Sequence, residues 1–206
     1  MNEKERFLVK VWPRITEFFD RFGSANYAGV VGIKEKVLSG PGWLGPYIWS
    51  ENGDTLRIIT RFCEDEFGFL HVHNESKIDR FRFANFNENE SWKSIDIDVT
   101  NASECSERDD YEKFRNLTHT LFIEVKQIIK GNNMYRGYEK KMVGFHYDCI
   151  KLCEQVKKGR CKYAIAILID DGDLDGKPYV PSEFIEKMRR SFPSVEILVW
   201  QKKGDK

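Results

Sequence analysis

Several features that would place a protein in a membrane, outside the cell or on DNA are missing from this sequence. The N-terminus, MNEKERFLVKVW, has no basic segment followed by an apolar run, and no stretch approaches the roughly 20 apolar residues that a membrane-spanning helix needs. The 33 Lys and Arg residues balance the 33 Asp and Glu residues, so the molecule as a whole does not attract nucleic acid or an anionic membrane. We therefore expect a soluble protein with no membrane partner, in which any nucleic acid is bound by a local patch.

Cysteine pairs are also missing. The 5 cysteines are odd in number and scattered, and no two form a CxxC pair, so the sequence indicates neither a disulfide framework nor a structural zinc site. A reducing cytoplasm fits this pattern best. A chain of 206 residues is long enough for one good core. We interpret it as a single domain: an N-terminal helical addition and loop (1–49), a core (50–170), and a C-terminal helix and strand (171–206).

The apolar pattern predicts an α/β protein. Helical spacing predicts helices, and alternating or continuous apolar runs predict strands. A mixed central sheet flanked by helices follows from the order of these elements. The predicted helices are 3–22, with Pro13 as a kink or a second start, then 50–66, a helix from beyond Gly137 to near Gly159, and 182–191. The predicted strands are 69–72, 78–86, 94–100, 120–128, 163–170 and 195–200. The run YAIAILID at 163–170 predicts a central strand covered on both faces.

Two strands carry the residues that indicate chemistry. In SIDIDVT, the apolar Ile95, Ile97 and Val99 are expected on one face, which leaves Asp96 and Asp98 together on the other. In LFIEVKQ, the same alternation projects Glu124 and Lys126 from one face. Carboxylates gathered in this way attract hard divalent cations, and a lysine beside the cation can position water or offset charge on a phosphate oxygen.

The sequence resembles the PD-(D/E)XK nuclease superfamily over about residues 50–170. The resemblance rests on an aspartate strand followed by a strand with the triplet Glu124-Val125-Lys126, then a basic loop, a helix and an apolar strand. Ile95 stands where the motif has its proline. The resemblance implies a restriction-endonuclease-like core and a nuclease that uses Mg²⁺ or Mn²⁺ and acts on nucleic acid, with DNA favoured over RNA. It also implies Asp96, Glu124 and Lys126 as the catalytic residues, with Asp98 as the alternative aspartate.

Further residues are assigned around this core. The resemblance makes Glu51 a third metal ligand, from a helix ahead of the sheet, with Glu64 and Glu66 as less favoured alternatives. Basic residues of the segment after the triplet are candidates for contact with nucleic acid, with a solvated loop as the alternative: Lys130, Arg136, Lys140 and Lys141. His146 and Asp148 either support the site or are surface residues, and we favour the surface. Cys149 and Cys153 are expected in the core.

Two other interpretations of the charged residues stay open. Glu124 and Lys126 could line the polar side of a half-exposed sheet without any chemistry. Alternatively, the chain could be a catalytically inactive nuclease-fold binding module in an intracellular complex. The oligomeric state is open between a monomer and a homodimer.

Overall fold

The computed structural model describes residues 1–22, 55–80, 92–100, 119–128, 134–170, 172 and 177–202. Side chains are not described for every residue in these ranges. The helical elements are α1 (Glu3–Arg6), a π-helical turn (Phe7–Val11), α2 (Trp12–Phe22), α4 (Leu56–Phe67), a 3₁₀ turn (Phe69–His71), α6 (Met134–Lys157) and α7 (Ser182–Ser191). The strands are β1 (Val72–Arg80), β2 (Trp92–Val99), β3 (His119–Ile128), β4 (Cys161–Asp170) and β5 (Glu196–Gln201).

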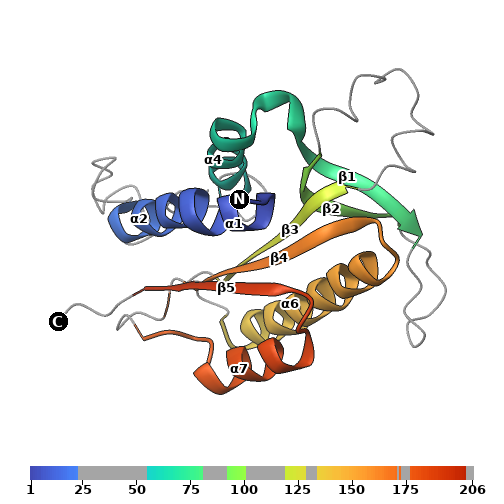
Figure 1. Cartoon of the computed structure of the whole chain (residues 1–206). Helices are drawn as coiled ribbons and strands as arrows, with labels where there is room; N and C mark the ends of the chain where they lie inside the picture. The colour runs from blue at the N-terminus through green and yellow to red at the C-terminus, as the bar shows by residue number, and fades with distance from the viewer. Residues whose placement is uncertain are drawn as a thin grey trace, which may run out of the picture.

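The strands form one mixed sheet in the order β1-β2-β3-β4-β5. β2 is antiparallel to both of its neighbours, whereas β3, β4 and β5 run parallel. Figure 1 shows α1, α2 and α4 on one side of this sheet and α6 and α7 on the other. The predicted α/β class, with a mixed central sheet flanked by helices, is confirmed.

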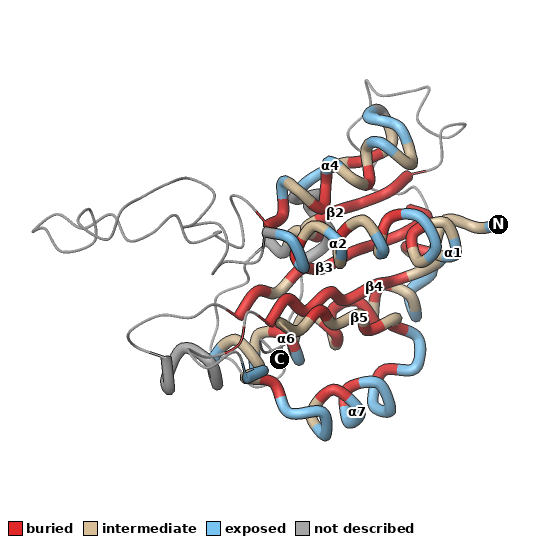
Figure 2. The backbone as a smooth tube through the Cα atoms, turned by 90° about the vertical axis from the view of Figure 1, so that its left-hand side faces the viewer, coloured by how far each residue is buried: buried red, intermediate tan, exposed pale blue. Residues whose placement is uncertain are grey.

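Each face of the sheet packs against its own hydrophobic cluster. The first cluster joins α2 and α4 to the odd-numbered residues of β3 and β4, such as Ile123 and Ile167. The second joins α6 and α7 to even-numbered residues such as Phe122 and Ala166. Figure 2 shows the buried strands as the middle of these layers. Because the period of a strand is two, neighbouring residues of β3 point to opposite layers, and Glu124 points to the same side as Phe122.

The strand β4 is covered on both faces, as predicted. Every residue from Ala164 to Leu168 is at most 1% exposed, with no alternation along the strand. Its last residue, Asp170, is also buried, and its carboxylate accepts hydrogen bonds from the backbone N–H groups of Gly172, Tyr179 and Val180. This carboxylate fixes the chain beyond the sheet as it turns toward α7.

The N-terminal helix is continuous but irregular. A π-helical turn ends at Val11, two residues before Pro13. Proline has no N–H and its ring crowds the preceding turn, so a widened turn ahead of it accommodates Pro13 without ending the helix. Asp20 near the end of α2 accepts a hydrogen bond from Nε1 of Trp200 in β5, at 2.9 Å, which ties the helix to the sheet.

The predicted strand at 69–72 is wrong, and the predicted strand at 78–86 begins too late; its residues 81–86 lie outside the described residues. Residues Phe69–His71 form a 3₁₀ turn, and a single strand β1 covers Val72–Arg80. Gly68 ends α4 as predicted, with φ of 93°. The apolar residues at Phe69 and Leu70 gave the first segment the appearance of a strand, but Phe69 is 71% exposed and packs in neither cluster.

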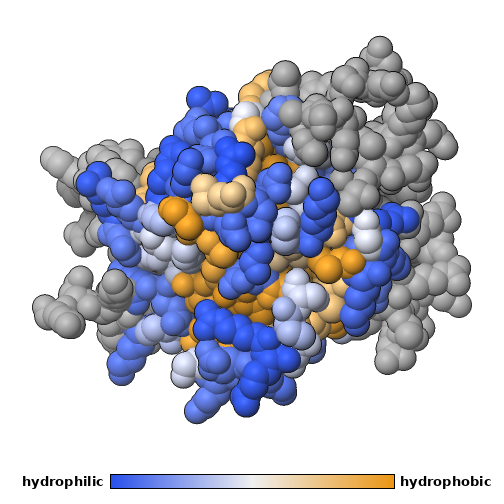
Figure 3. Space-filling view, viewed as in Figure 1, coloured by the Kyte–Doolittle hydropathy of each residue, from blue (hydrophilic) through white to orange (hydrophobic). Residues whose placement is uncertain are grey.

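The last strand, β5, forms one edge of the sheet. In the view of Figure 3, hydrophobic surface lies near the middle of the molecule, where Figure 1 draws β5, between more hydrophilic surfaces above and below it. Leu198 and Val199 of this strand are half-buried. Among the described helices, none has both the length and the apolar character to cross a lipid bilayer.

Candidate active site

The candidate site lies where β2 and β3 separate beneath α6. Pairing between these strands covers β2 only from Ile97 to Val99. Beyond this pairing, Oδ2 of Asp96 accepts a hydrogen bond from the backbone N–H of Val125 at 2.8 Å, in place of a partner from the backbone of β2. The side chain of Asp96 is thereby fixed next to Glu124. Ile95 packs in the cluster under α6, whereas Ile97 and Val99 pack on the other face, so the predicted common face of these three residues is wrong.

Glu124 is buried under α6 and is paired with a lysine of that helix. Nζ of Lys151 lies 2.5 Å from Oε1 of Glu124. The same ammonium group donates a hydrogen bond to the carbonyl oxygen of Ser94 in β2, at 3.0 Å. Lys151 itself is only 6% exposed. It therefore connects α6 to both strands of the site.

Lys126 lies two residues beyond Glu124 in β3 and contacts an acidic residue of α6. Its Nζ lies 3.2 Å from Oδ2 of Asp148, whose other oxygen lies 3.8 Å from Nζ of Lys151. A Cβ atom built on Gly144 would lie 3.7 Å from Cε of Lys126, so the helix passes closely over this lysine. The site thus contains three carboxylates and two ammonium groups.

The electrostatics of the site are dominated by burial. Burial raises the pKa of Asp96, while the Val125 N–H and the positive charge of Lys151 oppose the rise. Burial also raises the pKa of Glu124 well above its usual value; Lys151 opposes this rise, and the negative charges of Asp96 and Asp148 add to it. Because the charges of Asp96, Glu124, Asp148 and Lys151 act on one another in this way, they form one electrostatic unit.

The structure also distinguishes the two aspartates of β2. Asp98 is fully buried, and its Oδ2 lies 2.7 Å from Nδ1 of His119, at the start of β3. Its negative charge also acts on Cys161 in β4, where burial raises the pKa of the thiol to about 12 and Asp98 adds to the rise. Asp98 is therefore part of a buried contact at the far end of β2, whereas Asp96 is the aspartate that lies with Glu124.

Comparison of the chain with protein-family models, with curated proteins and with solved structures finds no match in any of the three. The assignment of chemistry to the site therefore rests on the geometry of the residues themselves.

The other residues predicted from the sequence are only partly within the described structure. Glu51 and Lys130 lie outside the described residues. Arg136 is part of α6, and its side chain is not described. Lys140 is exposed and Lys141 half-buried on the same helix. Both precede Gly144 by one helical turn, so they continue the face of α6 that passes over Lys126.

Sequence reasoning missed two residues of the site. Asp148 is half-buried and contacts Lys126 instead of lying at the surface, and the strand motifs assign no role to Lys151. The signal that could have found them is the spacing of polar residues beside the apolar stripe of α6. Asp148, Lys151 and Gln155 recur at i, i+3 and i+7, which brings them onto one side of the helix. Lys151 and Gln155 are both buried. Cys149 and Cys153 lie in the core, as predicted.

The donor chemistry of the site fits a hard divalent cation. Mg²⁺ and Mn²⁺ prefer oxygen ligands. The site offers them from the carboxylates of Asp96, Glu124 and Asp148 and from the carbonyl group of Ser94. Within the described ranges, however, no group of three or more His, Cys, Asp or Glu side chains is arranged to hold a metal ion as it stands. The ammonium group of Lys151 lies among these oxygens instead.

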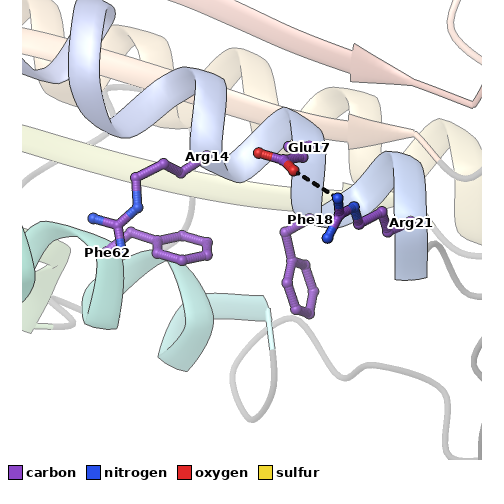
Figure 4. A pocket seen from close by; sticks show the side chains of 5 residues that line it. All are labelled: Arg14, Glu17, Phe18, Arg21 and Phe62. Carbon is purple, nitrogen blue, oxygen red and sulfur yellow. Dashed lines mark ion pairs between the residues drawn. The ribbon is translucent and has the colours of Figure 1, made fainter.

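A pocket of about 170 Å³ lies on the opposite side of the sheet, between α2 and α4. Figure 4 shows its lining, in which two arginines and a glutamate surround two phenylalanine rings: Arg14, Glu17, Phe18, Arg21 and Phe62. The guanidinium of Arg14 stacks 4.6 Å from the ring centre of Phe62 and pairs with Asp65, and Arg21 pairs with Glu17. The sheet separates this pocket from the carboxylates under α6, so the pocket is not part of the candidate active site.

Proposed function

We propose that the chain is a metal-dependent nuclease that hydrolyses phosphodiester bonds of nucleic acid, with DNA as the favoured substrate, on a restriction-endonuclease-like core. One observation carries the proposal: Asp96, Glu124 and Lys126 come from neighbouring strands and lie together under the helix that follows the second strand. The order of β2, β3, α6 and β4 also agrees with the order of elements that the resemblance requires.

Each residue has a definite task in this proposal. Asp96 and Glu124 are the ligands of Mg²⁺ or Mn²⁺, and Glu51 is assigned as a third ligand from the sequence alone. When bound, the ion supplies Lewis-acid chemistry at the phosphate. Lys126 orients the attacking water or offsets the negative charge that develops on a phosphate oxygen. Asp148, at 3.2 Å from Nζ of Lys126, orients that ammonium group and is therefore a positioning residue.

The start of α6 is the proposed contact with the nucleic-acid backbone. Lys140 and Lys141 continue the helix face that carries Asp148 and Lys151, so a strand that reaches Lys126 passes close to them. Lys130 and Arg136 are assigned to the same role from the sequence. Such contacts are local, and a local patch is what a chain with formal net charge zero requires.

A second candidate function is a nuclease-fold binding module without catalytic activity. The contact between Lys151 and Glu124 favours it, because an ammonium group already lies against the carboxylate that would bind the metal ion. In this case, the positive charge of Lys151 permanently replaces the charge of the cation.

A cleavage assay distinguishes the two candidates. The full chain is incubated with single- and double-stranded DNA and with RNA, in Mg²⁺ or Mn²⁺, with EDTA as the negative control. We expect cleavage that EDTA abolishes, and Lys126→Ala should lower the rate by about two orders of magnitude or more, because one preorganised charge is lost. Lys157→Ala, an exposed position on the same helix, is the matched control and should leave the rate unchanged.

Two results would contradict the nuclease. If Lys126→Ala cleaves as fast as the parent, the activity belongs to another site or to a contaminant. If the parent binds these nucleic acids but cleaves none of them, the binding module replaces the nuclease as the better description.

A further inference from the structure

The position of Lys151 indicates more than a structural ion pair. Its Nζ lies 2.5 Å from a carboxylate oxygen of Glu124, 3.0 Å from the carbonyl oxygen of Ser94 and 3.8 Å from a carboxylate oxygen of Asp148. An environment of two carboxylates and a carbonyl is also what a hard divalent cation selects. The ammonium group therefore lies in a setting that a metal ion would choose.

Because Glu124 is buried, its carboxylate needs a positive partner. Glu124 is 3% exposed, and the ammonium group of Lys151 contacts the Glu124 carboxylate. A buried carboxylate without a positive partner is strongly disfavoured. Lys126 is engaged at 3.2 Å with Asp148, on the other side of the cluster. Lys151 thus supplies the charge that lets Asp96, Glu124 and Asp148 lie close together.

We infer that Lys151 is an internal cation of the resting site and that a divalent ion can bind Glu124 only when the Lys151 ammonium group leaves it. This inference rests on the proposed function, since it concerns how the same site accepts its metal. Mg²⁺ needs oxygen ligands at about 2.0–2.1 Å. An ammonium group at 2.5 Å from the same carboxylate oxygen leaves no room for the ion and repels it.

The fold permits such an exchange. Lysine has a flexible four-carbon stem, so its charged end can move while its backbone stays in α6. Asp148, three residues earlier on the helix, offers the ammonium group a second carboxylate. Lys151 is therefore a positioning residue that competes with the metal, and metal affinity in the parent is lower than the carboxylates alone would give.

Calorimetric titration of the full chain with Mn²⁺ tests the inference. We expect Lys151→Met, which keeps the unbranched stem of the side chain and removes its charged end, to bind Mn²⁺ at least about tenfold more tightly than the parent. This is a conservative expectation for removing a unit charge within about 4 Å of a divalent ion. The exposed Lys157→Met is the matched control on α6 and should bind like the parent, and Glu124→Gln should abolish binding.

The outcomes separate this inference from the proposed function. If the parent binds Mn²⁺ through Glu124 and Lys151→Met binds no more tightly, the inference is overturned and the nuclease proposal stands. If neither the parent nor Lys151→Met binds Mn²⁺ at millimolar concentration, both fail.

Thermal melting gives a second readout, because Lys151→Met leaves Glu124 without its partner and lowers stability. Mn²⁺ should raise the melting temperature of Lys151→Met by more than it raises that of the parent. The inference is overturned if Mn²⁺ raises the melting temperature of Lys151→Met by no more than it raises that of the parent. It is also overturned if Lys151→Met is unfolded without metal and Mn²⁺ does not restore its folding.

Discussion

The two aspartates of β2 should respond in opposite ways to the same chemical change. Asp98 is fully buried, and its Oδ2 lies 2.7 Å from Nδ1 of His119. The change Asp98→Asn keeps the shape but removes the charge that faces the imidazole. Disturbing a contact between two buried polar groups costs about 1–3 kcal/mol, and the amide also brings a new NH₂ donor into a fully buried position, so we expect a loss of about 1.5–3 kcal/mol.

Asp96→Asn should cost much less stability. Burial raises the pKa of Asp96, which means that the folded state disfavours its negative charge, and Glu124 and Asp148 lie close by. The amide oxygen of asparagine can still accept the hydrogen bond from the Val125 N–H. We expect the free energy of unfolding to change by less than about 1 kcal/mol.

Urea unfolding at pH 7, followed by circular dichroism in the presence of EDTA, measures both variants without a contribution from bound metal. With a typical slope of about 1–3 kcal/mol per M, Asp98→Asn should lower the midpoint by about 1 M, and Asp96→Asn should leave it nearly unchanged. The cleavage assay should give the reverse ranking, because Asp96→Asn removes a metal ligand. Equal losses of stability, or a larger loss for Asp96→Asn, would refute the assignment of these two residues.

Two further predictions test the layers around the sheet. Ile167→Ala in β4 should lower the free energy of unfolding by about 2–5 kcal/mol in the same urea assay, because it leaves a cavity at a fully buried position. The control Val143→Ala, on the exposed side of α6, should change the free energy of unfolding by less than about 0.5 kcal/mol. A loss under 1 kcal/mol at Ile167 would contradict a two-sided core. Burial raises the pKa of the thiols of Cys63 and Cys149, and it raises that of Cys161 to about 12. Because the thiolate is the reactive form, iodoacetamide at pH 8 should alkylate these cysteines about three orders of magnitude more slowly in the folded protein than in urea. Mass spectrometry that finds rapid alkylation of these cysteines without denaturant would show that α4 and α6 do not cover the sheet.

The elements that could be predicted from the sequence are those whose pattern is decided by burial. The continuous apolar run of β4 predicts a strand covered on both faces, and the structure confirms it. The helix at 182–191 is also found with the predicted boundaries. By contrast, β1 was predicted in two pieces. Its polar residues from His73 to Lys77 carry no apolar alternation, and its extended form comes from pairing with β2.

The candidate site was only partly predictable, because it depends on contacts between elements distant in the sequence. Alternation along the strands put Asp96 with Asp98 and Glu124 with Lys126. It could not tell which aspartate lies beside Glu124, since this depends on where β2 separates from β3 and on the side chain of His119. Lys151 and Asp148 enter the site through the docking of α6 on the sheet, which no local pattern encodes.

The central claim is that Asp96 and Glu124 bind a catalytic divalent ion, and a crystal of the full chain soaked in Mn²⁺ tests it most directly. Anomalous diffraction locates manganese independently of any assumption about activity. We predict an anomalous peak in contact with the carboxylates of both Asp96 and Glu124, with the Lys151 ammonium group moved away from Glu124. A crystal that takes up manganese elsewhere, or takes up none while Lys151 stays on Glu124 at saturating Mn²⁺, would contradict the account.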